Sequence, residues 1–300
     1  MRHLPSWLIV GAIGILVALA AADAIRPHTE SKPTPAKAET SAPASLSGVV
    51  VVAGPDCSVS ALHLPDLAEQ NPPRQPDCGG LLWTRDGSLA ARCTPDNGSL
   101  VLTADLEFTA RAAGCAFGWR DDGSLSLVRH GDLVLWRRRG GERSVMTQAQ
   151  LVQQLKGRAE RLERPETYRF AEVSWGDESS FAAILQGDRP WETAIARFTN
   201  GTLDWLVPVF GSHAEGLRTN AGGSVAYARA VPVREYRVLG ADGREVKLPR
   251  IGNANDLAWS PDEKWVAIET RTRTFLARPG RTKTVELPLG GESIDWMPSG

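Results

Sequence analysis

Apolar and polar positions follow one short design that returns six times along the chain. Each copy has an apolar strand, usually ending near a tryptophan, then a polar turn, and the first five copies continue into a second strand. The copies occupy residues 79–91, 115–128, 171–184, 214–228, 255–268 and 292–300. Their anchor positions are Trp83, Trp119, Trp175, Arg218, Trp259 and Trp296, spaced 36, 56, 43, 41 and 37 residues apart. A period of about 40 residues is typical of a β-propeller, in which each repeat forms one four-stranded blade. We therefore predict an all-β fold, a six-bladed β-propeller.

Each of the first five copies is followed by further apolar segments, so that each repeat contains four predicted strands. The fourth, for example, predicts strands at 215–219, 224–230, 233–239 and 244–248. The sixth copy offers a single strand, 293–297, and strands at 48–53 and 58–64 supply its remainder. We expect both termini to build this blade and close the ring, because a lone strand would expose an unpaired edge. The last eight residues are then structural.

The gap of 56 residues between the second and third anchors contains an insertion. Within residues 147–164, Leu151, Leu155, Ala159 and Leu162 fall at helical spacing among polar residues. Thr147 is a suitable N-cap, and a proline follows the segment. We predict an amphipathic helix that packs its leucines on the ring. A role as a lid or as a partner-docking element is the alternative.

The amino terminus has the composition of an export or membrane segment. Residues 8–22 form an apolar run of fifteen residues, between the length of a signal-peptide core and that of a membrane-spanning helix. We predict a signal anchor or signal peptide at 1–25, a flexible linker rich in Pro, Ala, Ser and Thr at 26–46, and the propeller at 47–300. The linker favours a retained transmembrane helix, with the propeller outside the cytoplasm. Cleavage at the small residues near Ala22, giving a secreted protein, stays the alternative.

All four cysteines follow this segment. Cys78 and Cys115 begin inner strands, whereas Cys57 and Cys93 follow or end the strands that would lie against them in the repeat. The repeat therefore predicts the disulfides Cys57–Cys78 and Cys93–Cys115, with separations of 21 and 22 residues. A metal site would need closely spaced Cys and His ligands, which this sequence does not contain. Disulfides indicate an oxidising compartment.

Bulk composition and motifs exclude several classes of function. A net charge of −1 gives no global attraction to nucleic acid or to an anionic membrane. The sequence contains no nucleophile elbow, HExxH, CxxC or P-loop motif, and its histidines are isolated. We predict no cofactor, no metal and no nucleic-acid partner.

The segment NDLAWSPDEKWVAIET at 255–270 resembles the TolB-like, WD40-like propeller repeat, whose inner strand ends in Trp-Ser-Pro-Asp-Gly. Glu263 replaces the glycine here, and the matches at residues 83–87 and 119–123 are partial. Over residues 47–300, the chain resembles this family in its propeller architecture. It implies an envelope or cell-surface propeller that binds proteins, peptides or envelope polymers. The repeated motif is a folding device, so it implies fold rather than function.

The leading hypothesis is a non-enzymatic, membrane-tethered module that binds a protein or an envelope polymer with one face. In a propeller, the turns between second and third strands share a face with the connections between blades. We predict that this face presents Asp96, His130, Asp132, Asp188, Arg189, Arg234, Glu235, Arg271 and Arg273. Mixed charge of this kind suits polar protein recognition.

The alternative hypothesis is an enzyme of the lactonase or sugar-dehydrogenase propeller type, acting at the channel mouth. It would require several oxygen ligands around one point, with a metal such as calcium. Asn255, Asp256 and Asp295 are the inner-strand candidates.

Overall fold

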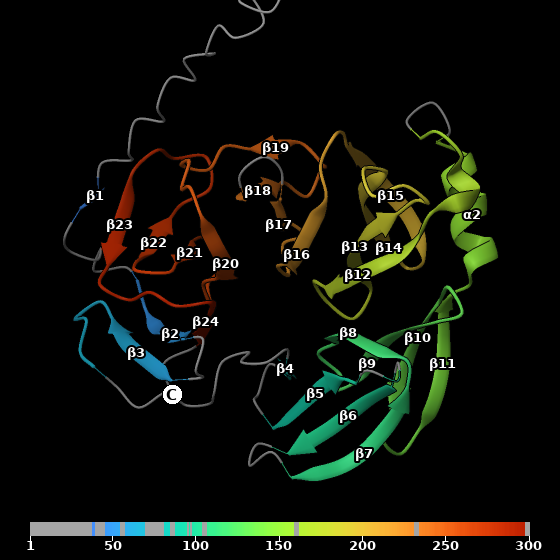
Figure 1. The fold of residues 1–300 in the computed structure, drawn as a ribbon, viewed down its shortest axis with the longest axis horizontal. Helices are drawn as coiled ribbons and strands as arrows, with labels where there is room; N and C mark the ends of the chain where they lie inside the picture. The colour runs from blue at the N-terminus through green and yellow to red at the C-terminus, as the bar shows by residue number, and fades with distance from the viewer. Residues whose placement is uncertain are drawn as a thin grey trace, which may run out of the picture. The chain divides into compact units, whose positions relative to one another are not determined.

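A computed structural model of the chain describes residues 38–39, 46–54, 58–69, 81–84, 88–94, 96, 98–103, 107–158, 162–230 and 234–297. The described residues form six β-sheets, which follow one another in sequence order around a common centre (Figure 1). Within each of the first five sheets, the repeat strands are consecutive in sequence and antiparallel. This arrangement is an all-β, propeller-like fold, as the repeat predicts.

The strands have the following bounds. The first sheet contains β4 (Leu81–Trp83), β5 (Leu89–Cys93), β6 (Gly98–Thr103) and β7 (Phe108–Ala113), and the second contains β8 (Cys115–Trp119), β9 (Leu125–Arg129), β10 (Asp132–Arg137) and β11 (Gly141–Met146). The third contains β12 (Arg169–Trp175), β13 (Ser180–Gln186), β14 (Thr193–Thr199) and β15 (Thr202–Val209), and the fourth contains β16 (Ala214–Thr219), β17 (Val225–Arg229), β18 (Glu235–Leu239) and β19 (Glu245–Val246). The fifth contains β20 (Ala254–Trp259), β21 (Val266–Thr270), β22 (Thr274–Ala277), β23 (Thr284–Leu287) and β1 (Ala38–Glu39), and the sixth contains β24 (Ser293–Met297), β2 (Gly48–Ala53) and β3 (Val59–Leu64).

The core lies between neighbouring sheets. Second strands such as β13 and β17 are buried along almost their whole length, on both faces. Their sequences, Ser-Phe-Ala-Ala-Ile-Leu and Val-Ala-Tyr-Ala, are almost continuously apolar, which suits a strand packed between two layers. Inner strands of successive sheets lie against one another, from β4 and β8 through to β20 and β24.

The two ends of the propeller segment build the sixth sheet together. β24 pairs antiparallel with β2, from Val49 opposite Met297 to Ala53 opposite Ser293, and β2 pairs with β3. The indole nitrogen of Trp296 donates to the main-chain oxygen of Ser47. These contacts confirm that strands from both termini form one sheet. Among the described residues, the strand count differs from four in two places: the sixth sheet has three strands, and β1 adds a parallel fifth strand beside β23.

The inserted helix is shorter than predicted. α2 spans Gln148–Lys156, Thr147 forms a capping box with Gln150, and Gly157 is the C-cap. Leu151 and Leu155 are buried in the core of the third sheet, which confirms the N-cap and the packing. A 3₁₀ turn, η2, follows at Pro165–Thr167, and the described residues 157–158 and 162–164 are not helical, although the apolar spacing predicted a helix within 147–164.

The disulfide Cys93–Cys115 is present and joins the end of β5 to the start of β8, with a Cα–Cα distance of 4.9 Å. It ties the first sheet to the second, as predicted. The second predicted pair, Cys57–Cys78, lies outside the described residues. The predicted transmembrane helix at 1–25 also lies outside them, and no helix within the described part of the chain is long and apolar enough to span a bilayer.

Candidate functional site

The nine residues predicted to share a binding face all lie at second-to-third strand connections. Asp96, His130, Asp188, Arg189, Arg234, Arg271 and Arg273 lie in turns between those strands, and Asp132 and Glu235 begin third strands. Side chains at this end also contact the connections between sheets. Asp132 accepts from the main-chain nitrogen of Gln148 at the start of α2. No hydrogen bond or ion pair among the described residues joins one of the nine to another.

Most of these nine residues have local partners. Asp96 pairs with Arg111 and accepts from Thr94, and Arg273 pairs with Glu286. Others are paired through Arg234–Glu215, Glu235–Arg237 and Asp188–Arg164. His130 is exposed and occupies a left-handed backbone conformation with φ of 53°. Arg189, however, belongs to a hollow in the surface of the third sheet.

We call this hollow the aromatic groove. Three segments line it: residues 162–168 after α2, residues 189–193 in the β13–β14 turn, and residues 208–211 at the end of β15. Its volume is about 540 Å³. The three segments meet here because the turn between second and third strands lies at the end of the sheet where the first strand begins and the fourth ends. The groove therefore lies on the predicted face.

Two aromatic side chains project at the groove. Trp191 is 57% exposed and Phe210 is 77% exposed, although both are large and apolar. The guanidinium of Arg189 lies over the Trp191 ring, 5.9 Å from its centroid, which is cation–π geometry. The sequence-based prediction missed both aromatics, because it selected charged and titratable residues at these turns. Trp191 is not at an anchor position and follows a proline in a turn, which was the available signal.

An ion pair between the exposed Arg164 and the buried Glu192 lies beside the groove. Glu192 is only 8% exposed, and Arg164 Nη2 donates to its two carboxylate oxygens at 2.8 and 3.0 Å. This hydrogen bond, before any other cause, lowers the pKa of Glu192, so the carboxylate stays ionised. A Cβ on Gly187 would lie 2.7 Å from the Glu192 carboxylate, so the position requires glycine.

The turn that carries Trp191 is fixed on both sides. Gln186 Nε2 donates to the main-chain oxygens of Arg189 and Glu192, at 2.7 and 3.1 Å. On the opposite wall, Tyr168 is buried, and burial raises the pKa of its hydroxyl. Gln148 of α2 donates to the main-chain oxygen of Tyr168. The groove is thus preformed by polar contacts beneath an apolar surface.

The three residues predicted at the channel mouth, Asn255, Asp256 and Asp295, form hydrogen bonds with main-chain groups. Asp256 accepts from the main-chain nitrogens of Leu257 and of Ile294 on the next inner strand, and the Asn255 side chain donates to the main-chain oxygen of Gly291. Asp295 accepts from the main-chain nitrogen of Trp296. Among the described residues, no three His, Cys, Asp or Glu side chains converge to hold a metal ion.

Comparison with known proteins concerns the fold. No protein-family profile and no curated protein sequence matches the chain. The β-propeller domain of Myceliophteria thermophila Cps50 (Swd1) is 11% identical, with a TM-score of 0.49, over 85% of this chain and 91% of that domain. The Dos1 propeller is 13% identical, with a TM-score of 0.44, over 84% of this chain and 75% of that one. A eukaryotic initiation factor is 12% identical, with a TM-score of 0.39, over 82% and 74%. Similarity this low says nothing about what the chain binds.

Proposed function

We propose that this chain is a non-enzymatic, extracytoplasmic protein-binding propeller, and that the aromatic groove is where it takes its partner. The observation that carries the proposal is the pair of exposed aromatics, Trp191 and Phe210, lining one preformed groove. Large apolar side chains exposed together mark interaction sites, because their hydration costs free energy until a partner covers them.

The chemistry of the groove suits a protein surface. Tryptophan and arginine dominate the residues that carry binding energy at protein interfaces, and Trp191 and Arg189 occur here in contact. A volume of about 540 Å³ admits a few partner side chains. A stable interface covers about 800 Å² on each partner, so the groove would form its apolar centre and the charged turns its polar rim.

An envelope polymer is the other class that the sequence-based hypothesis included. The groove favours protein, because its two exposed aromatic rings lie beside the cation of Arg189, and tryptophan and arginine are the residue types enriched where protein interfaces bind most strongly. Attachment to a membrane through residues 1–25 remains part of the proposal and has its own measurement, the intact mass of the mature chain.

Site-specific photo-cross-linking in the source cells tests the proposal. A benzophenone amino acid replaces Phe210 in one variant and Phe108 in another, because Phe108 is also 65% exposed but lies on β7 of the first sheet. We expect a discrete protein adduct at position 210 that is absent at position 108. Trp191→Ala in the same background should abolish the adduct.

The remaining outcomes decide against the proposal. Equal adducts at both positions, or none at 210, would remove the groove as a protein site. An adduct containing carbohydrate instead of peptide would transfer the site to an envelope polymer. Stoichiometric calcium in the purified chain, together with no adduct, would favour the lactonase or sugar-dehydrogenase alternative.

A further inference from the structure

The fourth sheet has an incomplete outer strand. β19 contains only Glu245 and Val246, which pair with Leu239 and Val238 of β18. Continued in the same register, β19 would bring residues 247–249 opposite residues 237–235 of β18. The sequence pattern predicted a strand to residue 248, but the structure ends it at 246. Three residues of β18 therefore have β17 on one side and no strand on the other in the described part of the chain.

Two local features explain why the strand stops. The main-chain oxygen of Lys247 accepts from the nitrogen of Gly280, at 2.8 Å, in the β22–β23 connection of the fifth sheet. Two residues later, Pro249 has no N–H to give to a ladder. The chain thus bends away from β18 toward the fifth sheet.

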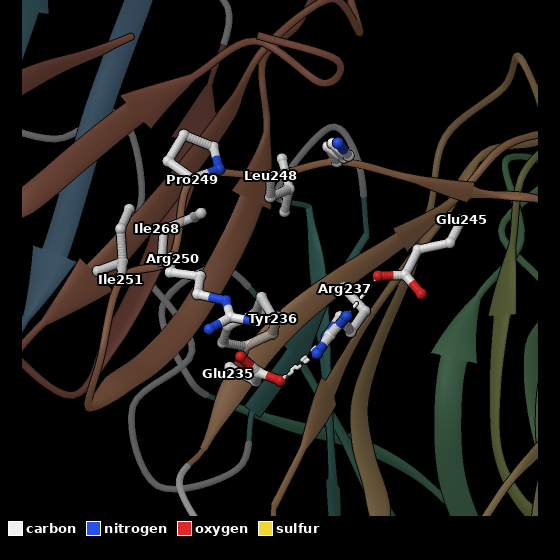
Figure 2. Close-up of a pocket in the computed structure, with 10 residues that line it drawn as sticks. Glu235, Tyr236, Arg237, Glu245, Leu248, Pro249, Arg250, Ile251 and Ile268 are labelled. Atoms are coloured by element: carbon white, nitrogen blue, oxygen red, sulfur yellow. Dashed lines mark hydrogen bonds and ion pairs between the residues drawn. The ribbon is translucent and has the colours of Figure 1, made fainter. Parts of the chain in front are cut away.

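A pocket of about 250 Å³ remains along the open edge, and we call it the edge pocket. It lies between residues 235–237 of β18, residues 247–251 of the departing segment, and Ile268 of β21. Figure 2 shows the Arg250 side chain extending from that segment toward Glu235 and Tyr236. Ile251 and Ile268 are buried and give the pocket an apolar wall.

The charged side chains that line the edge pocket carry a net charge of +1, because Arg237, Lys247 and Arg250 stand against Glu235 and Glu245. Arg237 pairs with both Glu235 and Glu245, so these three groups together keep one negative charge. Lys247 and Arg250 are exposed, and neither forms an ion pair with a described carboxylate. A ligand entering the pocket therefore meets these two exposed cations beside the Arg237 ion pairs, an apolar wall and an open strand edge.

We propose that the edge pocket binds an extended peptide of a partner protein, which adds a strand to β18 and directs carboxylates toward Lys247 and Arg250. An open edge presents N–H and C=O groups in strand geometry, and an added strand satisfies them. Alternate side chains of the peptide would face the apolar wall. The propeller already shows such an addition within itself, because β1 pairs with the outer strand β23 of the fifth sheet. This site goes beyond the aromatic groove and uses none of its residues.

The experiment uses the full-length chain in a mild detergent and labelled hexapeptides in fluorescence anisotropy. One peptide alternates Glu and Val, a second alternates Lys and Val, and a third repeats the first with N-methylated main-chain nitrogens. We expect the Glu/Val peptide to bind, and the other two to bind at least about tenfold more weakly. Because the third peptide alters only the ligand, its result does not depend on how a protein variant folds.

Charge reversal locates the site. Lys247→Glu with Arg250→Glu should weaken Glu/Val binding at least about tenfold. The matched control is Arg138→Glu with Arg139→Glu, an equal charge change in the exposed β10–β11 turn, which should leave binding unchanged. Trp191→Ala should also leave it unchanged, so failure here and failure of the aromatic groove are distinguishable.

Three results would overturn the proposal. Equal binding of the N-methylated peptide would exclude strand addition, and equal binding of the Lys/Val peptide would exclude charge recognition. No binding of any peptide would remove the site. A dimer in light scattering that the Lys247→Glu, Arg250→Glu variant converts to monomer would assign the edge to a second copy of this chain instead of a partner peptide.

Discussion

The indole nitrogen of Trp119 donates a hydrogen bond of 2.7 Å to the main-chain oxygen of Leu82. Trp119 ends the inner strand of the second sheet, and Leu82 lies in the inner strand of the first, so the bond joins two blades. The same relationship recurs between the fifth and fourth sheets, where Trp259 donates to the main-chain oxygen of Arg218 at 3.4 Å. Trp119 and Trp259 thus link neighbouring sheets, whereas the buried indole nitrogen of Trp175 has no hydrogen-bond partner among the described residues.

We expect Trp119→Phe to lower the free energy of unfolding by about 1–3 kcal/mol, because it keeps an aromatic ring but leaves the Leu82 carbonyl without its donor. Trp136→Phe is the matched control. Trp136 packs in the same core cluster, and its indole nitrogen has no acceptor among the described residues. Urea unfolding of the full-length chain measures both. Equal losses in the two variants would mean that ring size, and not the hydrogen bond, sets the cost.

The disulfide Cys93–Cys115 closes a separation of 22 residues between the first two sheets. Replacing both cysteines by serine should lower the free energy of unfolding by about 3 kcal/mol, mainly because the unfolded chain regains conformational freedom. Urea unfolding of the wild type and the double variant, each with and without reductant, measures this difference. Reductant should no longer change stability through this bond in the variant. Peptide mapping of the unreduced protein tests the other predicted pair, Cys57–Cys78. A Cys57–Cys93 linkage would contradict both assignments.

Glu269 has an environment that makes stability depend on pH. It is 0% exposed on β21, and both carboxylate oxygens are buried. Burial is the largest cause that raises the pKa of Glu269 to about 8; the carboxylates of Asp256 and Glu292 raise it further, and the main-chain N–H of Gly291 and the charge of Arg234 oppose the rise. The folded state therefore holds a proton that the unfolded state releases near its ordinary pKa of 4.5.

The free energy of unfolding falls with rising pH, because the pKa of Glu269 is higher in the folded state than in the unfolded state. Stability from this group is full below pH 4.5 and declines as pH rises toward 8, with a slope of at most about 1.4 kcal/mol per pH unit. Glu269→Gln should remove the slope, whereas Glu107→Gln, at an exposed position, should not. Urea unfolding from pH 5 to 9 measures the three curves. Parallel curves for the wild type and Glu269→Gln would show that Glu269 ionises normally in the folded state.

The hydrophobic pattern predicted the sheets because strands packed on both faces carry strong apolar signals, as in 180–186 and 225–229. It predicted ends less well where tertiary contacts decide them. The helix stops at Gly157, although apolar spacing continues to Leu162. β19 stops at Val246, because Lys247 bonds to a connection in the next sheet.

The sequence predicted where the candidate site lies in the fold, but it did not predict which side chains line it. Strand order places second-to-third strand turns and inter-sheet connections on one face, so Arg189 was identified. Charge was the criterion for choosing residues, and most charged residues on that face turned out to have local partners. The exposure of Trp191 and Phe210 depends on which side chains surround them, which the sequence pattern does not specify.

The connection between the fifth and sixth sheets passes through a tight space. The main-chain nitrogen of Gly291 donates to the Thr270 carbonyl, and that of Glu292 donates to the Ala53 carbonyl, at 3.2 and 2.8 Å. A Cβ on Gly291 would lie 2.4 Å from the Ala53 oxygen and 2.5 Å from a Val52 methyl group. Because the Ala53 oxygen belongs to the main chain of β2, a side chain at position 291 would have to displace β2 and with it the sixth sheet.

We therefore expect Gly291→Ala to lower the free energy of unfolding by about 1–3 kcal/mol, the usual cost of overpacking. Gly252→Ala is the matched control, because no heavy atom lies within 4 Å of the Cβ that it would add. That variant should stay within about 0.5 kcal/mol of the wild type. Urea unfolding of the full-length chain compares the two, and amide hydrogen exchange should show faster exchange in β2 and β24 for Gly291→Ala alone. Wild-type stability in Gly291→Ala would mean that the sixth sheet is not held against this connection, and that its pairing from both termini tolerates displacement.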